Sequence, residues 1–292
     1  MALSTTKGDA SSEVAATDLS ADGAAEAQPL FGQKIPNRII QIGKDQQFSV
    51  RQKAVMANMR LLNGDFEYLY FDNQQKEEFV RRMYPQYASV YDSFRYPIQK
   101  YDFFRYLAVH FYGGFYFDID VLLASGLSPL LELGCVFTFE AITTSHYLRN
   151  DLSMDWQIGN YAFGATPQHP FLEAIIENCV RGQRDPDWMK PMMRGTPPFR
   201  GDEFYVINST GPGLVSRTYA ENADLAKMIT VLYPDDVCDH RNWNGFGEFG
   251  THLADSSWRS KQSFLKSKLS GYLWRWIQYR RVKDSRIRRL MK

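Results

Sequence analysis

Two aspartates separated by a single residue follow an aromatic run near the middle of the chain. The run is Phe115 to Phe117, and the acids are Asp118 and Asp120. If the strand continues through them, both side chains point to the same side, with backbones about 6 to 7 Å apart. The two carboxylates can then converge on one hard cation. Unpaired carboxylates are costly inside an ordinary core strand, so this pair is a candidate ligand site.

The spacing alone is not specific, because the chain contains a second example. Asp185-Pro186-Asp187 has the same spacing in what we predict to be a polar loop. What distinguishes Asp118 and Asp120 is their place at the end of a predicted strand, since open α/β sheets bind ligands beyond the carboxyl ends of their strands. The alternative, two solvated loop carboxylates, stays open on the residues alone.

A helix predicted over Ile98 to Tyr112 must position further polar groups near this pair. It stops at Gly113-Gly114, where a left-handed cap costs least, and leads directly into the aromatic strand. Asp102 and Arg105 are three residues apart and share one face of this helix. They form either a surface ion pair or part of the ligand site.

The preceding segment predicts the fold class. We expect a strand over Arg38 to Ile42, a helix over Ser49 to Leu62 and a strand over Phe66 to Phe71. Strand, helix and strand in that order indicate an α/β domain with a parallel sheet. The further predicted elements are helices over 74–83, 86–94 and 171–180 and strands over 115–123, 136–139, 161–164 and 228–233.

Composition and charge divide the chain into three parts. Residues 1–30 are small and polar, which predicts a disordered leader. Residues 31–258 are expected to form the folded domain. Residues 259–292 carry twelve basic residues and one acid, a net +11, so the rest carries −10 of the total of +1. An acidic body of this kind excludes ordinary nucleic-acid binding by the domain.

The basic segment has apolar residues at helical spacing from Leu265 to Trp276. This pattern is typical of a helix lying on an anionic membrane surface, and equally of a C-terminal helix docked on the domain. Three widely spaced cysteines and the absence of an apolar leader or an 18-residue apolar run indicate a cytoplasmic protein, with peripheral membrane attachment as the open question.

Several separate motifs resemble one enzyme family. Lys100 to Tyr106 followed by Tyr112 to Asp120 is similar to the signature of glycosyltransferases with a DXD sugar-binding region, family 32 in the usual classification. Ile35 to Ile42 resembles the family's first strand, and Ser209 to Gly213 resembles its Thr-Gly-Pro-Gly turn. His252 with Ser257-Trp258 resembles its C-terminal element.

The resemblance implies a GT-A type, Rossmann-like α/β domain with a mixed, mostly parallel sheet. It also implies a retaining glycosyltransferase that moves a hexose or N-acetylhexosamine from a UDP- or GDP-linked donor to a glycan or lipid-linked acceptor. The implied cofactor is Mn²⁺ or Mg²⁺, which would neutralise the departing diphosphate. A front-face substitution is the expected mechanism, because the sequence offers no convincing nucleophile.

The resemblance also assigns roles to individual residues. Asp118, Asp120 and His252 would form the metal site. Asp102 and Arg105 would contact the donor's ribose or sugar and its phosphate side, and Asn160 would lie near the donor sugar. The wall of the nucleotide pocket would include Ile42, and Trp258 would stack on the ligand or act as a lid.

Two departures from the family pattern leave the nucleotide and the sugar open. Tyr101 stands where relatives usually have a small residue, and Gln41-Ile42-Gly43 replaces a commoner His-Gln-Ile-Trp run. The alternatives are a catalytically inactive nucleotide-sugar or glycan-binding relative, a metal-dependent phosphohydrolase, and a nucleic-acid protein acting through the basic segment.

Overall fold

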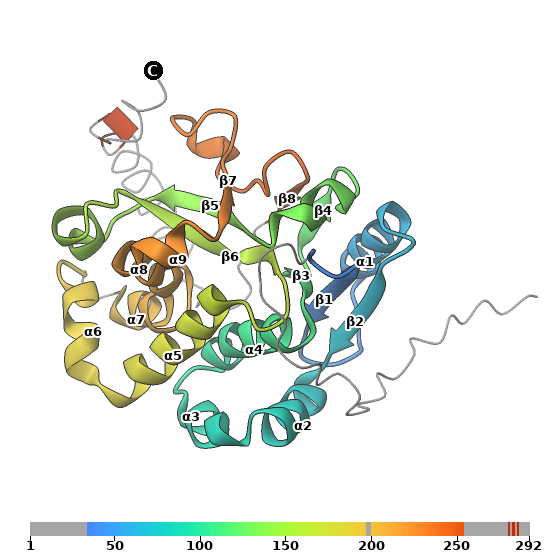
Figure 1. The fold of residues 1–292 in the computed structure, drawn as a ribbon, viewed down its shortest axis with the longest axis horizontal. Helices are drawn as coiled ribbons and strands as arrows, with labels where there is room; N and C mark the ends of the chain where they lie inside the picture. Colours follow the sequence, from blue (N-terminus) through green and yellow to red (C-terminus); the bar gives the residue numbers. More distant parts are fainter. Residues whose placement is uncertain (1–33, 197–199, 254–279, 281, 284, 286–292) are drawn as a thin grey trace, which may run out of the picture.

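A six-stranded mixed sheet lies at the centre of the molecule (Figure 1). This computed structural model describes residues 34–196, 200–253, 280, 282, 283 and 285. The strand order is β2-β1-β3-β6-β5-β7. The strands are β1 (Arg38–Ile42), β2 (Glu67–Phe71), β3 (Gly114–Phe117), β5 (Cys135–Ile142), β6 (Trp156–Ala165) and β7 (Thr230–Leu232).

Three of the five pairings are parallel, and only β6 runs against its two neighbours. This confirms the expected α/β class with a mixed, mostly parallel sheet. Because β1, β2, β3, β5 and β7 run the same way, their carboxyl ends meet at one edge of the sheet. That edge is where an open α/β sheet binds ligands.

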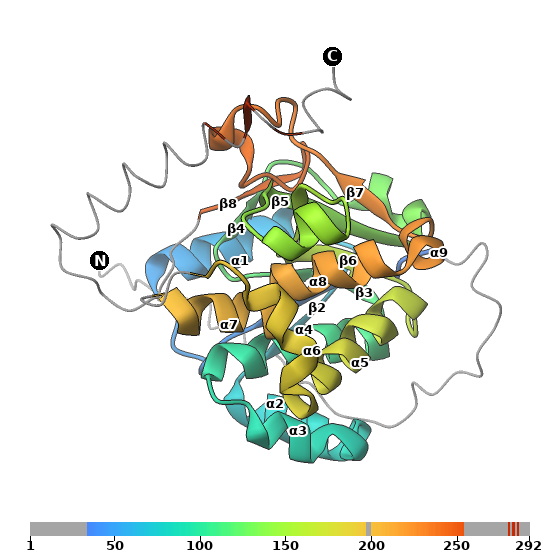
Figure 2. The ribbon, with the colours of Figure 1, turned by 90° about the vertical axis from the view of Figure 1, so that its left-hand side faces the viewer.

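Helices cover both faces of the sheet (Figures 1 and 2). Their bounds are α1 (Val50–Leu62), α2 (Asn73–Met83), α3 (Ala88–Ser93), α4 (Pro97–Tyr112), α5 (Pro170–Arg184), α6 (Pro186–Met193), α7 (Gly201–Ser209), α8 (Pro212–Glu221) and α9 (Ala223–Ala226). A separate two-stranded sheet pairs β4 (Val121–Leu123) with β8 (Gly250–His252).

Alternation along the strands builds a hydrophobic core on each face. Ile40 and Tyr116 face a core that includes α2, α4, α5 and α8, whereas Ile39, Phe115 and Phe117 face a second core that includes α1 and β4. The sheet is therefore buried on both sides, which is typical of sheets with crossover helices.

The link between α4 and β3 needs glycine at two consecutive positions. Gly113 has φ +64° and Gly114 has φ +103°. A Cβ at Gly114 would lie 2.7 Å from the carbonyl oxygen of Arg38. The chain therefore passes from α4 into β3 without a loop, which fixes the helix against the strand that precedes the two aspartates.

Two expectations were wrong. The strand predicted over 115–123 is broken at Asp118-Ile119-Asp120, which form a turn closed by a bond from Val121 N–H to the Asp118 carbonyl at 3.0 Å. The reason is that β4 leaves the main sheet to pair with β8, more than 120 residues later. In the predicted polar loop, Asp185 is the N-cap of α6 and Asp187 lies in the first turn of that helix.

Some predicted segments lie outside the described residues. These are the leader over 1–30, nearly all of the basic segment over 259–292, and Ser257-Trp258. The domain boundaries therefore stay predictions. In the described part of the chain, no helix is both long and apolar enough to cross a bilayer.

We predict that Phe163→Ala destabilises the fold by about 3 to 5 kcal/mol. The Phe163 ring is fully buried and stacks on Phe137, with centroids 4.9 Å apart and planes 3° apart. Urea unfolding measures the change. Leu61→Ala, at a side chain that is 83% exposed, is the control and should stay within about 0.5 kcal/mol. Equal effects of the two substitutions would contradict this packing.

Candidate active site

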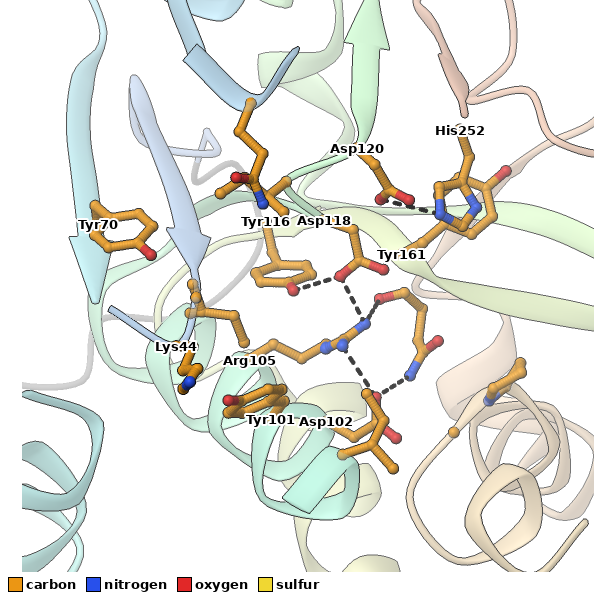
Figure 3. A pocket seen from close by; sticks show the side chains of 18 of the residues that line it. Lys44, Tyr70, Tyr101, Asp102, Arg105, Tyr116, Asp118, Asp120, Tyr161 and His252 are labelled. Carbon is orange, nitrogen blue, oxygen red and sulfur yellow. Dashed lines mark hydrogen bonds and ion pairs between the residues drawn. The ribbon is translucent and has the colours of Figure 1, made fainter. Parts of the chain in front are cut away.

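The candidate site lies at the edge of the sheet where the parallel strands end (Figure 3). A cavity of about 670 Å³ opens there. It is lined by residues after β1, by α4, and by the turn after β3. Ala162 of β6 pairs with Phe117, so Asn160 and Tyr161 come level with that turn. Of the predicted site residues, the cavity lining includes Ile42, Asp102, Arg105, Asp118, Asp120, Asn160 and His252.

Three of these side chains could hold a cation together. The ligand atoms of Asp118, Asp120 and His252 all lie within 4.8 Å of one another. Nε2 of His252 is 3.2 Å from Oδ1 of Asp120. Two carboxylates and an imidazole suit a divalent cation, and the carboxylates favour Mn²⁺ or Mg²⁺ over softer metals. These residues therefore fit the divalent ion that the DXD pattern implies.

Pairing between β4 and β8 brings the histidine to the aspartates. Val121 lies opposite His252, and Leu253 N–H donates to the Asp120 carbonyl at 2.9 Å. The His252 ring also stacks on Tyr161, with centroids 4.5 Å apart. Burial disfavours the protonated imidazole, but the hydrogen bond to Asp120 and the charges of Asp118 and Asp120 together raise the pKa of His252. The imidazole thus lies in a strongly negative environment, which a bound cation would neutralise.

Arg105 connects α4 to the metal-site residues. Its guanidinium is 3.0 Å from Oδ1 of Asp102 and 3.2 Å from Oδ1 of Asp118. It also donates to the backbone carbonyl of Asn160 at 2.7 Å. Asp102 and Arg105 are each 4% exposed, so they form a buried ion pair and not a surface pair.

Both carboxylate oxygens of Asp102 also accept hydrogen bonds. Asn160 Nδ2 donates to Oδ1 at 3.1 Å, and the Thr210 hydroxyl donates to Oδ2 at 2.9 Å. Burial raises the pKa of Asp102 to about 6, although Arg105 and Thr210 both oppose the rise. Burial also disfavours the charge of Arg105, but the surrounding negative groups, Asp118 first, raise its pKa.

Asp118 is held in one orientation by two donors. Both Arg105 and the Tyr116 hydroxyl, at 2.5 Å, contact its Oδ1 atom. Its backbone carbonyl accepts from Gln41 at 3.2 Å, and its N–H donates to the Tyr161 carbonyl at 2.8 Å. The other carboxylate oxygen, Oδ2, takes no part in these contacts.

The loop after β1 forms the opposite wall, and two neighbouring elements, α2 and β2, fix it. Lys76 Nζ donates to the Gly43 carbonyl at 2.9 Å, and Asn73 N–H donates to the Lys44 carbonyl at 3.2 Å. The Tyr70 hydroxyl donates to the Asp45 carbonyl at 2.6 Å. Three consecutive carbonyls are thus bonded to the scaffold.

A steric restriction explains why position 43 is a glycine. A Cβ on Gly43 would lie 1.9 Å from the Tyr70 hydroxyl oxygen. Tyr70 therefore occupies the space where a larger residue at this position would begin, and its ring lines the cavity.

Sequence reasoning missed several charged residues in or beside this site. The cavity lining includes Lys44, Asp45, Arg51 and Glu140, and Lys76 supports the wall from behind. Glu140 lines the cavity from the end of β5 and follows directly after the strand predicted over 136–139. Asp118 was predicted because ligand-binding residues follow the carboxyl ends of strands, and the same rule could have found Glu140. Lys76 is 1% exposed, and its Nζ lies 3.5 Å from the centroid of the Tyr101 ring. No sequence signal separates it from a surface lysine in a polar helix.

Part of the chain is similar to a known protein family. Residues 49–135 match the model of the family described as glycosyltransferase sugar-binding region containing DXD motif. Over these residues the chain is similar to that family. The matched residues of the DXD-containing family run from α1 through the aspartate turn to the start of β5 and include Asp102 and Arg105.

Two proteins similar to this chain come from yeasts. One is mannosyl phosphorylinositol ceramide synthase CSH1 of Saccharomyces cerevisiae, 26% identical over 217 residues, which cover 73% of this chain and 50% of the relative. The other is inositol phosphoceramide mannosyltransferase 1 of Schizosaccharomyces pombe, 29% identical over 168 residues, covering 56% and 48%. The chain spans about half the length of these relatives.

A solved structure is also similar. The ligand-free glycosyltransferase domain from the YGT toxin matches with a TM-score of 0.47 and 8% identity, covering 68% of this chain and 80% of the toxin chain.

We predict that replacing the buried lysine changes the pH dependence of stability. Burial lowers the pKa of Lys76 to about 7, and Arg105 adds to the decrease. Because an unfolded lysine titrates near 10.4, the unfolded chain binds more protons than the folded chain between these values. Wild type should therefore gain about 2 kcal/mol relative to Lys76→Met between pH 7 and pH 9.

Urea unfolding of both proteins at the two pH values measures this gain. Lys53→Met, at an exposed lysine, is the matched control and should show no such change with pH. A Lys76→Met difference that is the same at pH 7 and pH 9 would show that Lys76 is not held in a desolvated site.

Proposed function

We propose that this chain is a sugar transferase that moves mannose from a nucleotide-sugar donor to a glycolipid. The observation that carries the proposal is the convergence of Asp118, Asp120 and His252 at the cavity edge. Similarity of residues 49–135 to the DXD-containing glycosyltransferase family supports sugar transfer. The names of the two yeast relatives support mannose as the sugar and an inositol phosphoceramide as the class of acceptor.

The donor's diphosphate would bind beside the three metal-site residues. A divalent cation, when bound, neutralises the diphosphate and stabilises it as it departs. The buried Arg105 keeps Asp118 in place through Oδ1, which leaves Oδ2 for the cation. We infer Mn²⁺ or Mg²⁺ from the two carboxylates and favour Mn²⁺, because imidazole is a poor ligand for Mg²⁺.

The nucleoside would lie along the wall formed by the loop after β1. Ile42 and the aromatic rings of Tyr70 and Tyr101 line this part of the cavity. Apolar and aromatic walls with a few fixed polar groups are typical of nucleotide-sized ligands. Asp102 and Asn160, which are hydrogen-bonded to each other, form the floor nearest to the transferred sugar.

We further propose retention of configuration by front-face attack, in which the acceptor hydroxyl enters on the side of the departing diphosphate. Glu140 lines the same cavity, and we assign it no role as a nucleophile. Trp258 stays a predicted lid or stacking residue, because it lies outside the described residues. The cytoplasmic location likewise stays a prediction.

The test is a transfer assay with GDP-mannose, UDP-linked sugars and detergent-solubilised inositol phosphoceramide. We expect Mn²⁺-dependent turnover of one donor, reduced at least about 100-fold in Asp120→Asn. Asp187→Asn is the matched control, because Asp187 belongs to the chain's other Asp-x-Asp sequence, on α6. It should retain wild-type activity.

Two results would contradict the proposal. Absence of turnover with every donor, despite metal-dependent donor binding, would indicate an inactive nucleotide-sugar-binding relative. Wild-type turnover in Asp120→Asn would mean that the carboxylate pair is not the metal site.

A further inference from the structure

The exposed apolar side chains of the described residues are concentrated at one place. Five large hydrophobic side chains are exposed among the described residues, and four of them lie on α1 and β4. Val50 is 88% exposed and Leu61 83%, the two highest values, while Leu62 and Leu122 are nearly 40% exposed. Single exposed apolar residues are normal on a protein surface, but such clustering is not.

Helical geometry places four of these positions in one row. Val50, Ala54, Ala57 and Leu61 are spaced by four, three and four residues, so they share one face of α1. All four are exposed. The opposite face carries Val55, Met56 and Met59, which are buried against the domain. We call the exposed row the α1 ridge.

The neighbouring strand extends the α1 ridge sideways. The Asn58 side chain donates to the Leu123 carbonyl at 3.1 Å and accepts from the Leu123 N–H at 2.9 Å, so α1 and β4 are held together. Leu122, between two buried residues of β4, faces outward. Figures 1 and 2 both show α1 and β4 side by side at the periphery of the molecule.

The charged residues of α1 itself all have one sign. α1 contains Arg51, Lys53 and Arg60 and no acidic residue. Lys53 and Arg60 lie on one flank of the ridge, and Arg51 lies on the other. The nearest acid after the helix, Asp65, accepts a hydrogen bond from Asn37. An apolar row with basic flanks is the pattern of helices that lie in an anionic membrane interface.

The same helix also reaches the cavity. Arg51 and Gln52, in its first turn, line the cavity together with Phe48 just before it. A bilayer lying against the ridge would therefore bring lipid headgroups to the edge of the cavity. With 13 residues, α1 extends about 20 Å along such a surface.

We propose that the α1 ridge docks the chain on an anionic lipid bilayer, with the apolar row at the acyl boundary and the three basic side chains among the headgroups. This membrane contact would form whether or not the chain transfers sugar. Its role in giving access to a lipid acceptor rests on the proposed function. This contact is distinct from any contribution of the basic segment over 259–292.

A fluorescent probe on the ridge tests the proposal in the full chain. The design is Ala57→Cys labelled with nitrobenzoxadiazole in a Cys238→Ser background, because Cys135 and Cys179 are buried. The vesicles contain phosphatidylcholine with phosphatidylserine, or phosphatidylcholine alone, and hold no sugar acceptor. The matched control carries the label at Glu78→Cys, an exposed position on α2.

We expect a blue shift and a rise in emission for the label at position 57 on anionic vesicles, and none for the label at position 78. Adding Lys53→Ala and Arg60→Ala should lower the apparent affinity for anionic vesicles, measured by titration, on the order of tenfold. Because no donor or acceptor is present, failure of the transfer assay would leave this result unchanged.

Three outcomes would overturn the proposal. Labels at 57 and 78 that both stay in water while the chain sediments with vesicles would mean that the basic segment alone binds the membrane. An equal response on neutral vesicles would exclude the charge-assisted contact. A blue shift without vesicles that grows with protein concentration would mean that a second copy of the chain covers the ridge.

Discussion

Groups from several parts of the fold meet on the guanidinium of Arg105. Asp102 comes from the same helix, Asp118 from the turn after β3, and the Asn160 carbonyl from β6. A buried arginine is tolerated only when its charge is balanced. Here Nη1 and Nη2 meet two carboxylates and a carbonyl, while Nε has no hydrogen-bond partner in the described part of the chain. Loss of one partner from such a buried pair typically costs about 3 to 5 kcal/mol, because the other charge is left uncompensated. The ion pairs therefore hold helix, turn and sheet in one arrangement.

Because of these ion pairs, Asp102, Asp118 and Asp120 have different roles in the site. Asp102 is bonded to Arg105, Asn160 and Thr210, and these contacts fix the floor of the cavity. Asp118 gives one oxygen to Arg105 and Tyr116, which sets the direction of the other. Asp120 turns toward His252 instead. Only the last two can share a cation, and the short turn between them is what makes them neighbours.

Sequence reasoning predicted which residues come together at this site better than it predicted their geometry. Asp118 and Asp120 follow a strand as expected, but they converge through a turn and not through the pleat of a continuous strand. That turn forms because β4 pairs with β8, a long-range contact that local periodicity does not encode.

Lys76 was missed for a related reason. Its helix is polar, and only the tertiary contacts with Gly43 and Tyr101 reveal that its side chain is buried. Helices α6 to α9 also lacked clear signals, because they are short and partly amphipathic.

The central claim is that Asp118, Asp120 and His252 bind one divalent cation while Asp102 and Arg105 stay paired. A crystal structure with Mn²⁺ and the nucleoside diphosphate that binds, recorded at the manganese absorption edge, tests it most directly. The account predicts one anomalous peak in contact with all three side chains, with the Asp102–Arg105 ion pair intact. A peak elsewhere, or a peak that Asp102 coordinates after releasing Arg105, would contradict it.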